Sequence, residues 1–287
     1  MTTIQELLEQ LSPPRPAVLN HYTTQGGLLG IIQNKEIWAT HTQYLNDSRE
    51  FTHAIGLAKD ILSARIAEEV SETRKSALME MAESVDGQES INVCVASFSE
   101  DADSLSQWRA YSGTAGFCCT FASDDLATWA AVDRFSLIKC IYDELRQRQV
   151  LEQLIDIVLA EIETWKPEVD GDEPLQGGSL AAYLNQVAPA MKDPAFAAER
   201  EWRLVSRPMM VSLPRYGYRE GKSMLVPYYR MPLESDTAPF SIQSVTVGPA
   251  PNMKQSSAAV RGLLMKHKLV RPGSSKVTAS AIPYRNW

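Results

Sequence analysis

The sequence lacks a long apolar segment, a cluster of cysteines and an excess of basic residues. Its longest apolar run, Leu180 to Leu184, has five residues, whereas a membrane-spanning helix needs about 18. Its net charge of −7 argues against a protein whose whole surface binds duplex nucleic acid, because binding to phosphates requires a basic face. No basic segment precedes an apolar stretch at the N-terminus. We therefore expect a cytoplasmic protein with no membrane partner.

The cysteines and histidines are too scattered to form a clustered metal site. The four cysteines are Cys94, Cys118, Cys119 and Cys140. Their spacing fits neither metal ligation nor a redox pair, and adjacent Cys118 and Cys119 would point to opposite faces of a strand. We expect all four to be buried thiols, and we expect no bound metal.

The remaining composition is that of a globular protein. Of the 287 residues, 44% are hydrophobic and 22% are charged, and both values are ordinary. The length allows one large domain or two modest ones, and no repeat or linker divides the chain. We expect an N-terminal helical arm over residues 1–16, followed by a single domain over residues 17–287.

The residue patterns predict a mixed α+β fold. A strand–helix–strand unit is expected over residues 17–40, with Thr24 as the helix cap. Helical periodicity over residues 48–90 predicts an outer helical layer or lid that breaks near Ser71, and a helical insertion is expected at about 143–190. Further strands are expected at residues 91–99, 115–121, 199–205, 222–228, 241–247 and 277–283.

The segment at residues 199–205 is the clearest candidate for a catalytic site. Side chains of a strand alternate between its faces, so Glu199, Glu201 and Arg203 are expected on one face. Same-face neighbours lie about 6.6–6.8 Å apart at Cα, so each carboxylate raises the pKa of the other while Arg203 lowers both. The alternative is an exposed edge strand with an ion pair, although the apolar residues between the charges favour an internal strand.

His21 ends the first expected strand and begins a second candidate site. Tyr22, Thr23 and the pair Gly26-Gly27 follow it, before a helix. An imidazole, hydroxyl groups and the backbone N–H groups of a helix start could together bind ribose or phosphate oxygens. The alternative is a histidine with a purely structural role.

Two further polar segments could line a pocket. Ser97 and Ser99 share one face of an expected strand end, although such serines are more often turn caps. Tyr44 lies in a polar loop with Asn46 and Asp47, and its ring could stack on a flat ligand. The asparagine or the aspartate could equally cap the helix that follows.

Residues 199–230 form a basic stretch within an acidic protein. They contain seven basic and three acidic residues, and four tyrosines accompany them. Such a stretch could bind a pyrophosphate or single-stranded nucleic acid through guanidinium groups and base stacking. The alternative is a solvated face, or a partner for the acidic loop at residues 100–103.

In combination, five motifs resemble the bacterial domain-of-unknown-function 2971 family over roughly residues 19–267. They are His21-Tyr22-Thr23, Tyr44-Leu45-Asn46-Asp47, Ser97-Phe98-Ser99-Glu100 with Gln107-Trp108-Arg109-Ala110-Tyr111, Glu199-Arg200-Glu201-Trp202-Arg203-Leu204-Val205, and Val247-Gly248-Pro249. A strand-end histidine, a Ser-x-Ser strand and a late Glu-x-Glu strand are also similar, more distantly, to the ADP-ribosyltransferase superfamily. That resemblance implies a split β-sheet with flanking helices that binds NAD, although this chain has Ser-Phe-Ser where the superfamily has Ser-Thr-Ser.

The resemblance implies catalytic roles for three residues. Glu201 would be the catalytic glutamate, and Glu199 would face the acceptor substrate and take its proton. His21 would hold a ribose hydroxyl of NAD. Breaking the bond between nicotinamide and ribose develops positive charge on the ribose, which a carboxylate bound to the 2′-hydroxyl stabilises.

The resemblance also implies a set of NAD-binding residues. Ser97 and Ser99 would shape the wall of the pocket. Tyr44 is the first candidate to stack on nicotinamide, ahead of Tyr22 and Tyr111. The set is completed by Thr23 and Arg203.

These roles imply an NAD-dependent ADP-ribosyltransferase or an NAD glycohydrolase. The acceptor would be a macromolecule, either a protein or a single-stranded nucleic acid, and the resemblance suggests a bacterial toxin or a defence against phage. Two alternatives stay open. One is a nucleotide-sensing or interaction module on the same fold that does not turn NAD over. The other is a sugar hydrolase that uses the two glutamates as acid and base.

Overall fold

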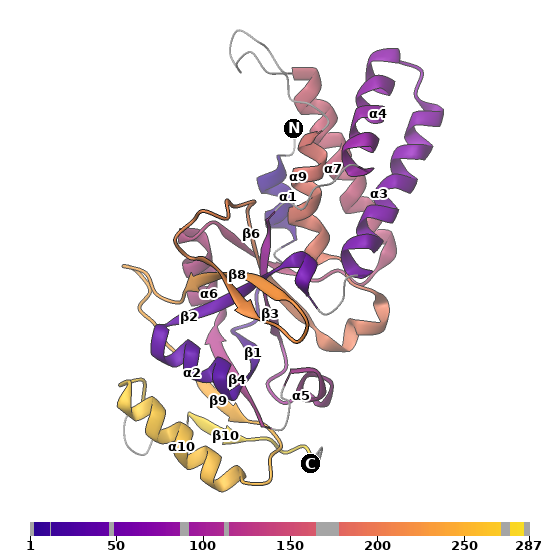
Figure 1. Cartoon of the computed structure of the whole chain (residues 1–287). Coiled ribbons are helices and arrows are strands. Elements are labelled where there is room, and N and C mark those ends of the chain that lie inside the picture. Colours follow the sequence, from indigo (N-terminus) through magenta and orange to yellow (C-terminus); the bar gives the residue numbers. More distant parts are fainter. Residues whose placement is uncertain are drawn as a thin grey trace.

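The structure is a computed structural model in which residues 3–11, 13–45, 49–86, 92–111, 115–164, 178–270 and 276–283 are described. It confirms the predicted mixed α+β class (Figure 1). Residues 165–177 of the predicted insertion, and the predicted loop residues Asn46 and Asp47, lie outside the described residues. Within the described ranges, no helix combines the length and the apolar composition that crossing a membrane would require.

The described strands form one large open sheet. They are β1 (Val18–Thr24), β2 (Glu36–His41), β3 (Cys94–Ser99), β4 (Gly116–Ala122), β5 (Phe135–Lys139), β6 (Glu201–Ser206), β7 (Tyr216–Glu220), β8 (Leu225–Pro232), β9 (Ser244–Val247) and β10 (Val277–Ala279). The strand order is β10-β9-β4-β1-β3-β2-β8-β7, and β6 and β5 extend from β3. The sheet is mixed because β9 and β10 pair in parallel, whereas the other pairs are antiparallel.

The helices form two groups that pack on the sheet (Figure 1). They are α1 (Ile4–Gln10), α2 (Gln25–Asn34), α3 (Arg49–Glu68), α4 (Glu72–Asp86), α5 (Leu105–Tyr111), α6 (Ser123–Val132), α7 (Glu144–Thr164), α9 (Gly178–Val187) and α10 (Met253–Lys266), with the short helices η1 (Thr42–Tyr44), η2 (Ala188–Ala190) and η3 (Pro194–Glu199). The break predicted near Ser71 is confirmed, and so is the Thr24 cap, whose hydroxyl accepts a hydrogen bond from the Gly27 N–H.

Two hydrophobic cores lie on opposite faces of the central strands. Ala96 and Phe98 of β3 belong to the first core, which α2, α6 and α10 cover. Val95 of β3 belongs to the second core, together with α1, α3, α4, α7 and α9. The predicted outer layer at residues 48–90 and the predicted insertion at about 143–190 therefore form one bundle, in which α3 contacts α7 and α4 contacts α9 (Figure 1). Alternation of side chains along β3 explains how one strand serves both cores.

The sheet splits beside β3. Val95 pairs with Thr40 of β2 and with Val205 of β6, and Ser99 pairs with Asn20 of β1 and with Glu201 of β6. Because β6 occupies one edge of β3, β1 and β2 must share the other edge. They meet β3 at its two ends and leave its middle residues without a strand neighbour on that side.

Gly248 is a position where a side chain would disrupt the fold. A Cβ there would lie 2.8 Å from the Trp108 ring and 3.0 Å from the Gly116 carbonyl oxygen. Trp108 is fully buried and its indole N–H donates to Asp103, so the ring has little freedom to move. We expect Gly248→Ala to lower the free energy of unfolding by about 1–3 kcal/mol, measured by urea denaturation.

The control for this substitution is Gly30→Ala in the interior of α2. A Cβ at Gly30 would meet nothing within 4 Å, and alanine is a better helix former than glycine. Gly30→Ala should therefore leave stability unchanged or raise it slightly. Equal effects of the two substitutions would contradict the close packing of Trp108 on Gly248.

Candidate functional site

Four charged side chains form a buried ion cluster at the start of β6. The Lys192 ammonium donates to Glu199 at 2.5 Å and to Glu201 at 2.6 Å. Arg203 donates to both oxygens of Glu201, from Nε at 2.7 Å and from Nη2 at 3.2 Å. The side chains of Lys192, Glu201 and Arg203 are 5% exposed, whereas that of Glu199 is 16% exposed. Glu199 is therefore the part of the cluster that solvent reaches most easily.

Local backbone structure brings these residues together from three segments. Glu201 and Arg203 lie on one face of β6 by alternation, as predicted. The predicted strand residue Glu199 is instead the last residue of η3, because Arg200 adopts the left-handed conformation with φ 46° and separates η3 from β6. The Lys192 backbone N–H donates a hydrogen bond to the Ile141 carbonyl, which holds the lysine beside both carboxylates.

The ion cluster also joins the sheet to the helical bundle. Arg203 Nη1 donates to the Pro189 carbonyl of η2 at 2.7 Å, and η2 contacts both β6 and α3. The Tyr142 hydroxyl accepts a hydrogen bond from the Glu201 N–H. Part of the function of the cluster is therefore structural.

The two carboxylates of the cluster have opposite pKa shifts. Burial alone would raise the pKa of Glu201, but the adjacent Arg203 and Lys192 cations lower it to about 2. Burial raises the pKa of Glu199, and the negative charge of Glu201 adds to that increase. Glu201 is therefore an ionised group held by two cations, whereas Glu199 binds a proton more readily.

Two aromatic rings lie beside the cluster and reach solvent. Tyr111, at the end of α5, is 36% exposed. Its partial burial and the charges of Glu201 and Glu199 raise its pKa to about 12. The Lys192 ammonium lies 5.1 Å from the centre of the exposed Phe196 ring. Of the three tyrosines predicted to stack on a ligand, only Tyr111 is placed next to the carboxylates by these interactions.

The two serines of β3 adjoin the cluster. Ser99 pairs with Glu201, and Ser97 pairs with Arg203, on the same face of the sheet. Ser99 is buried, and its hydroxyl donates to the Glu199 carbonyl and accepts from the Asp101 N–H. It therefore fixes the turns that flank the cluster. Ser97 is partly exposed and is the serine that could contact a ligand.

His21 lies at the split in the sheet. Its Nδ1 is 2.9 Å from the Ser97 carbonyl oxygen, and its ring packs against Phe98, 5.5 Å between centres. Asn20 pairs with Ser99, so alternation along β1 directs His21 toward the face opposite to that of Glu201. His21 and Glu201 thus reach β3 from different edges and different faces, so the structure does not bring these two predicted catalytic residues together.

The remaining candidate residues have local structural contacts. The Tyr22 hydroxyl donates to the Asp101 carbonyl and accepts from the Ser104 N–H, and its ring packs edge-on against Trp108. Thr23 occupies the space beside Gly27, where a Cβ would overlap the Thr23 hydroxyl. Tyr44 is exposed and packs against His41. His41 pairs with the first residue of β3, so Tyr44 lies near the opposite end of that strand from Ser99.

Lys192 is the residue of this site that sequence reasoning missed. It is a single lysine between apolar residues and Asp193-Pro194, and a lone charge in such a segment usually lies at the surface. The only available signal was its proximity in sequence to the two glutamates. Its role depends on the turn formed by η3, which no short motif specifies.

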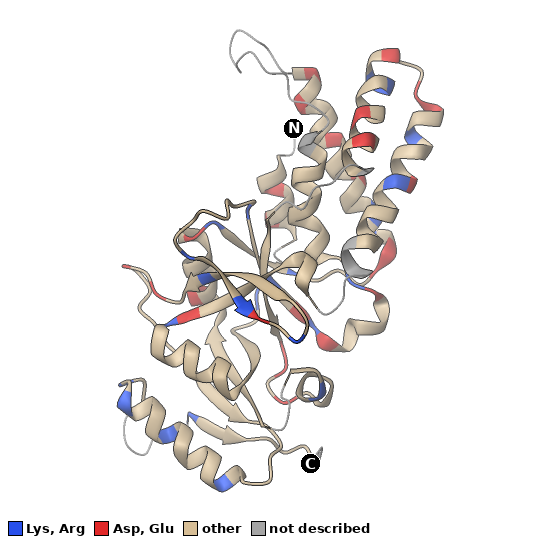
Figure 2. Cartoon of the chain, in the orientation of Figure 1, with Lys and Arg blue, Asp and Glu red and all other residues tan. Residues whose placement is uncertain are grey.

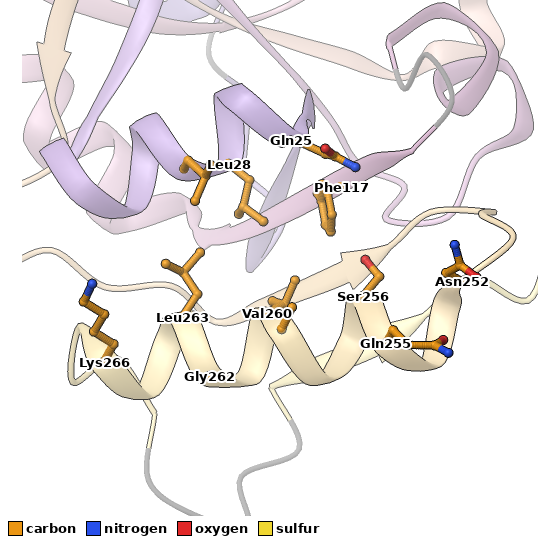
Figure 3. Close-up of a pocket in the computed structure, with 12 residues that line it drawn as sticks. Gln25, Leu28, Phe117, Asn252, Gln255, Ser256, Val260, Gly262, Leu263 and Lys266 are labelled. Atoms are coloured by element: carbon orange, nitrogen blue, oxygen red, sulfur yellow. The ribbon is translucent and has the colours of Figure 1, made fainter.

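A separate groove of about 680 Å³ lies between α2 and α10 (Figure 3). Leu28, Phe117 and Leu263 contribute apolar surface, Lys266 lies at one end and Asn252 lies at the other (Figure 3). None of the candidate residues predicted from the sequence lines it. This groove is therefore distinct from the ion cluster.

The depressed carboxyl pKa values predict acid sensitivity. Glu201 and Glu100 both have a pKa of about 2 in the folded protein, against an ordinary value of 4.5. Between these values the unfolded chain binds more protons than the folded one, so stability falls as the pH falls from 4.5 to 2. The raised pKa of Glu199 acts in the opposite direction at pH values above 4.5, so it does not alter the sign of the slope below 4.5. We expect the urea midpoint to decrease over this range, and to decrease less steeply in Glu100→Gln. A midpoint independent of pH would contradict the prediction.

The comparison with known proteins gives one family. A family model described as a protein of unknown function, DUF2971, matches residues 107–204, about a third of the chain. The matched segment contains Tyr111 and all four residues of the ion cluster, and it supports the DUF2971 family. No curated protein and no solved structure matches the chain.

Proposed function

We propose that this chain is an NAD-dependent ADP-ribosyltransferase or NAD glycohydrolase with an ADP-ribosyltransferase-like split sheet. The observation that carries the proposal is the Glu201 carboxylate, which Arg203 and Lys192 hold ionised beside Ser99 of β3. A fixed anion at this position is the group that the reaction needs, because positive charge develops on the ribose as nicotinamide leaves.

Glu201 can accept a further hydrogen bond. A carboxylate has about four acceptor positions, and three donors from described residues occupy those of Glu201, two on Oε2 and one on Oε1. In the proposed reaction Oε1 accepts a hydrogen bond from the 2′-hydroxyl of the ribose. Because the two cations are fixed before the reaction, this stabilisation requires little reorganisation.

Glu199 is the proposed proton acceptor. The bond between ribose C1′ and nicotinamide nitrogen breaks, and nicotinamide leaves with the electron pair. An acceptor group or water then bonds to C1′ and loses its proton to Glu199. The greater exposure of Glu199 and its raised pKa suit this role.

Tyr111 is the proposed NAD-binding residue with the best placement. Tyr111 lies beside both carboxylates, so we assign nicotinamide stacking to it in place of Tyr44. Burial lowers the pKa of His21, and Nδ1 donates to the Ser97 carbonyl, which leaves Nε2 as the acceptor of the neutral ring. His21 lies on the face opposite to Glu201, however, so it does not hold the ribose that Glu201 contacts, and we leave it out of the proposed NAD site.

The direct test is turnover of NAD by the purified protein. We expect release of nicotinamide, followed by chromatography, and transfer of ADP-ribose to a protein or a single-stranded nucleic acid when cell lysate is added. Such transfer would accord with the role in toxicity or phage defence that the resemblance suggests. The proposal is overturned if NAD is neither consumed nor bound, the latter measured by calorimetry.

A second candidate is a nucleotide-sensing or interaction module that does not turn NAD over. It is favoured by the 5% exposure of Glu201 and by the link from Arg203 to Pro189, since both features suit a structural cluster. Calorimetry separates the two functions. Tight NAD binding with no nicotinamide release over several hours would support the sensor and exclude the enzyme.

A further inference from the structure

One face of the sheet at β2, β8 and β7 carries aromatic and basic side chains, and no helix of the described ranges covers it. Pro227, Tyr229 and Met231 of β8 are less exposed and face the molecule, so alternation directs Tyr228 and Arg230 outward. Trp38 of β2 pairs with Arg230, and Arg219 of β7 lies on the same outer side. We call Trp38, Tyr228, Arg219 and Arg230 the aromatic-arginine face. In Figure 1 no α-helix lies in front of these strands.

The two aromatic rings are fixed in position. Trp38 is 42% exposed, and its ring lies 4.4 Å from that of Tyr228 with 30° between the planes. The Trp38 indole N–H donates to Glu36. The Tyr228 ring lies against Gly217, 3.4 Å from where a Cβ would be. Binding a flat ring here therefore costs little side-chain entropy, because the aromatic surface is already ordered.

The two arginines bring positive charge to these rings. Arg219 donates to the Thr40 hydroxyl at 3.0 Å, and Arg230 donates to the Pro214 carbonyl at 2.8 Å. Neither guanidinium forms an ion pair with a described carboxylate. Both partners are neutral, so each arginine keeps its charge and further donors for an anion. Figure 2 shows an acidic position on β2 and both acidic and basic positions on the β7–β8 hairpin, so the cationic surface is local.

We propose that the aromatic-arginine face binds single-stranded nucleic acid. A base stacks on the exposed Trp38 ring, which Tyr228 supports from the other side, and phosphates bind Arg219 and Arg230. Exposed aromatic planes beside cations are the combination by which proteins bind single strands without reading their sequence. A duplex hides its base planes and offers only its phosphates to this surface. The inference does not depend on NAD chemistry, although such a strand could serve as the acceptor of the proposed reaction.

The test is binding of a fluorescein-labelled oligothymidine of 12 nucleotides, measured by anisotropy without NAD. We expect Trp38→Ala to weaken binding by about 5–150-fold, from the usual contribution of one base stack. Tyr228→Ala should weaken binding by a smaller factor, because Tyr228 supports the Trp38 ring. Trp38→Phe should retain most of the affinity. Arg219→Ala and Arg230→Ala should each weaken binding and reduce the dependence of log affinity on log salt by about one.

The matched control is Tyr218→Ala. Tyr218 is also exposed and lies on β7 next to Arg219, but alternation directs it to the other side, where its ring packs against Tyr216. Its replacement should leave the affinity unchanged. The proposal is overturned if the wild type does not bind at 50 mM salt, if duplex binds as tightly as single strand, or if Trp38→Ala binds like the wild type. Because binding is measured without NAD, this result is independent of whether the protein turns NAD over.

Discussion

Arg203→Met is expected to lower the free energy of unfolding by about 3–5 kcal/mol, which is typical of breaking a buried ion pair from one side. The side chain is 5% exposed and donates to both Glu201 oxygens and to the Pro189 carbonyl. Methionine fills most of the volume, but it leaves the buried Glu201 charge with less compensation. Urea denaturation at pH 7 measures the effect.

Arg200→Met is the matched control for this prediction. Arg200 also pairs with a glutamate, Glu100, at 2.7 Å, but its side chain is 55% exposed. Exposed ion pairs contribute at most about 1 kcal/mol, so this variant should remain close to the wild type. Adding Glu201→Gln to Arg203→Met should restore part of the lost stability, because it removes the buried charge that Arg203 compensates. Equal destabilisation by Arg200→Met and Arg203→Met would contradict the account.

Features set by short stretches of sequence could be predicted. The sequence predicts Thr24 as a cap, because a hydroxyl before an apolar helix commonly accepts a hydrogen bond from an N–H at the helix start. The shared face of Glu201 and Arg203 follows from the two-residue period of a strand. The burial of the four cysteines and the opposite faces of Cys118 and Cys119 are confirmed as well.

Features set by contacts between distant segments could not be predicted. The two-residue period predicts Glu199 in the strand, because nothing in its neighbours signals that Arg200 adopts a left-handed conformation. Lys192 reaches the carboxylates only because η3 turns the chain back. The face of the sheet to which His21 points is set by the register in which β1 pairs with β3, and this register cannot be deduced from the residues around His21. The joining of residues 48–90 with the predicted insertion likewise depends on packing, since either segment alone has the pattern of a surface helix.

Glu201→Gln is expected to reduce the rate of nicotinamide release by about 10²–10³-fold, the usual cost of removing one group that stabilises charge developing in the transition state. Glutamine has nearly the same size and can still accept a hydrogen bond from Arg203, so the packing around residue 201 is largely kept. Glutamine lacks the negative charge that stabilises the positive charge developing on the ribose. Steady-state rates at saturating NAD give the comparison, with near-ultraviolet circular dichroism to verify that the variant is folded.

Glu100→Gln is the control that separates catalysis from stability. The Glu100 carboxylate also has a pKa of about 2, and it accepts from Lys139, Arg200 and Trp202. Trp202 faces the first core, away from the ion cluster. Losing this charge should therefore lower stability without lowering the rate of the folded enzyme. If both variants lose turnover equally, the effect of Glu201 is structural. If neither loses turnover, Glu201 does not stabilise the transition state and the assignment is wrong.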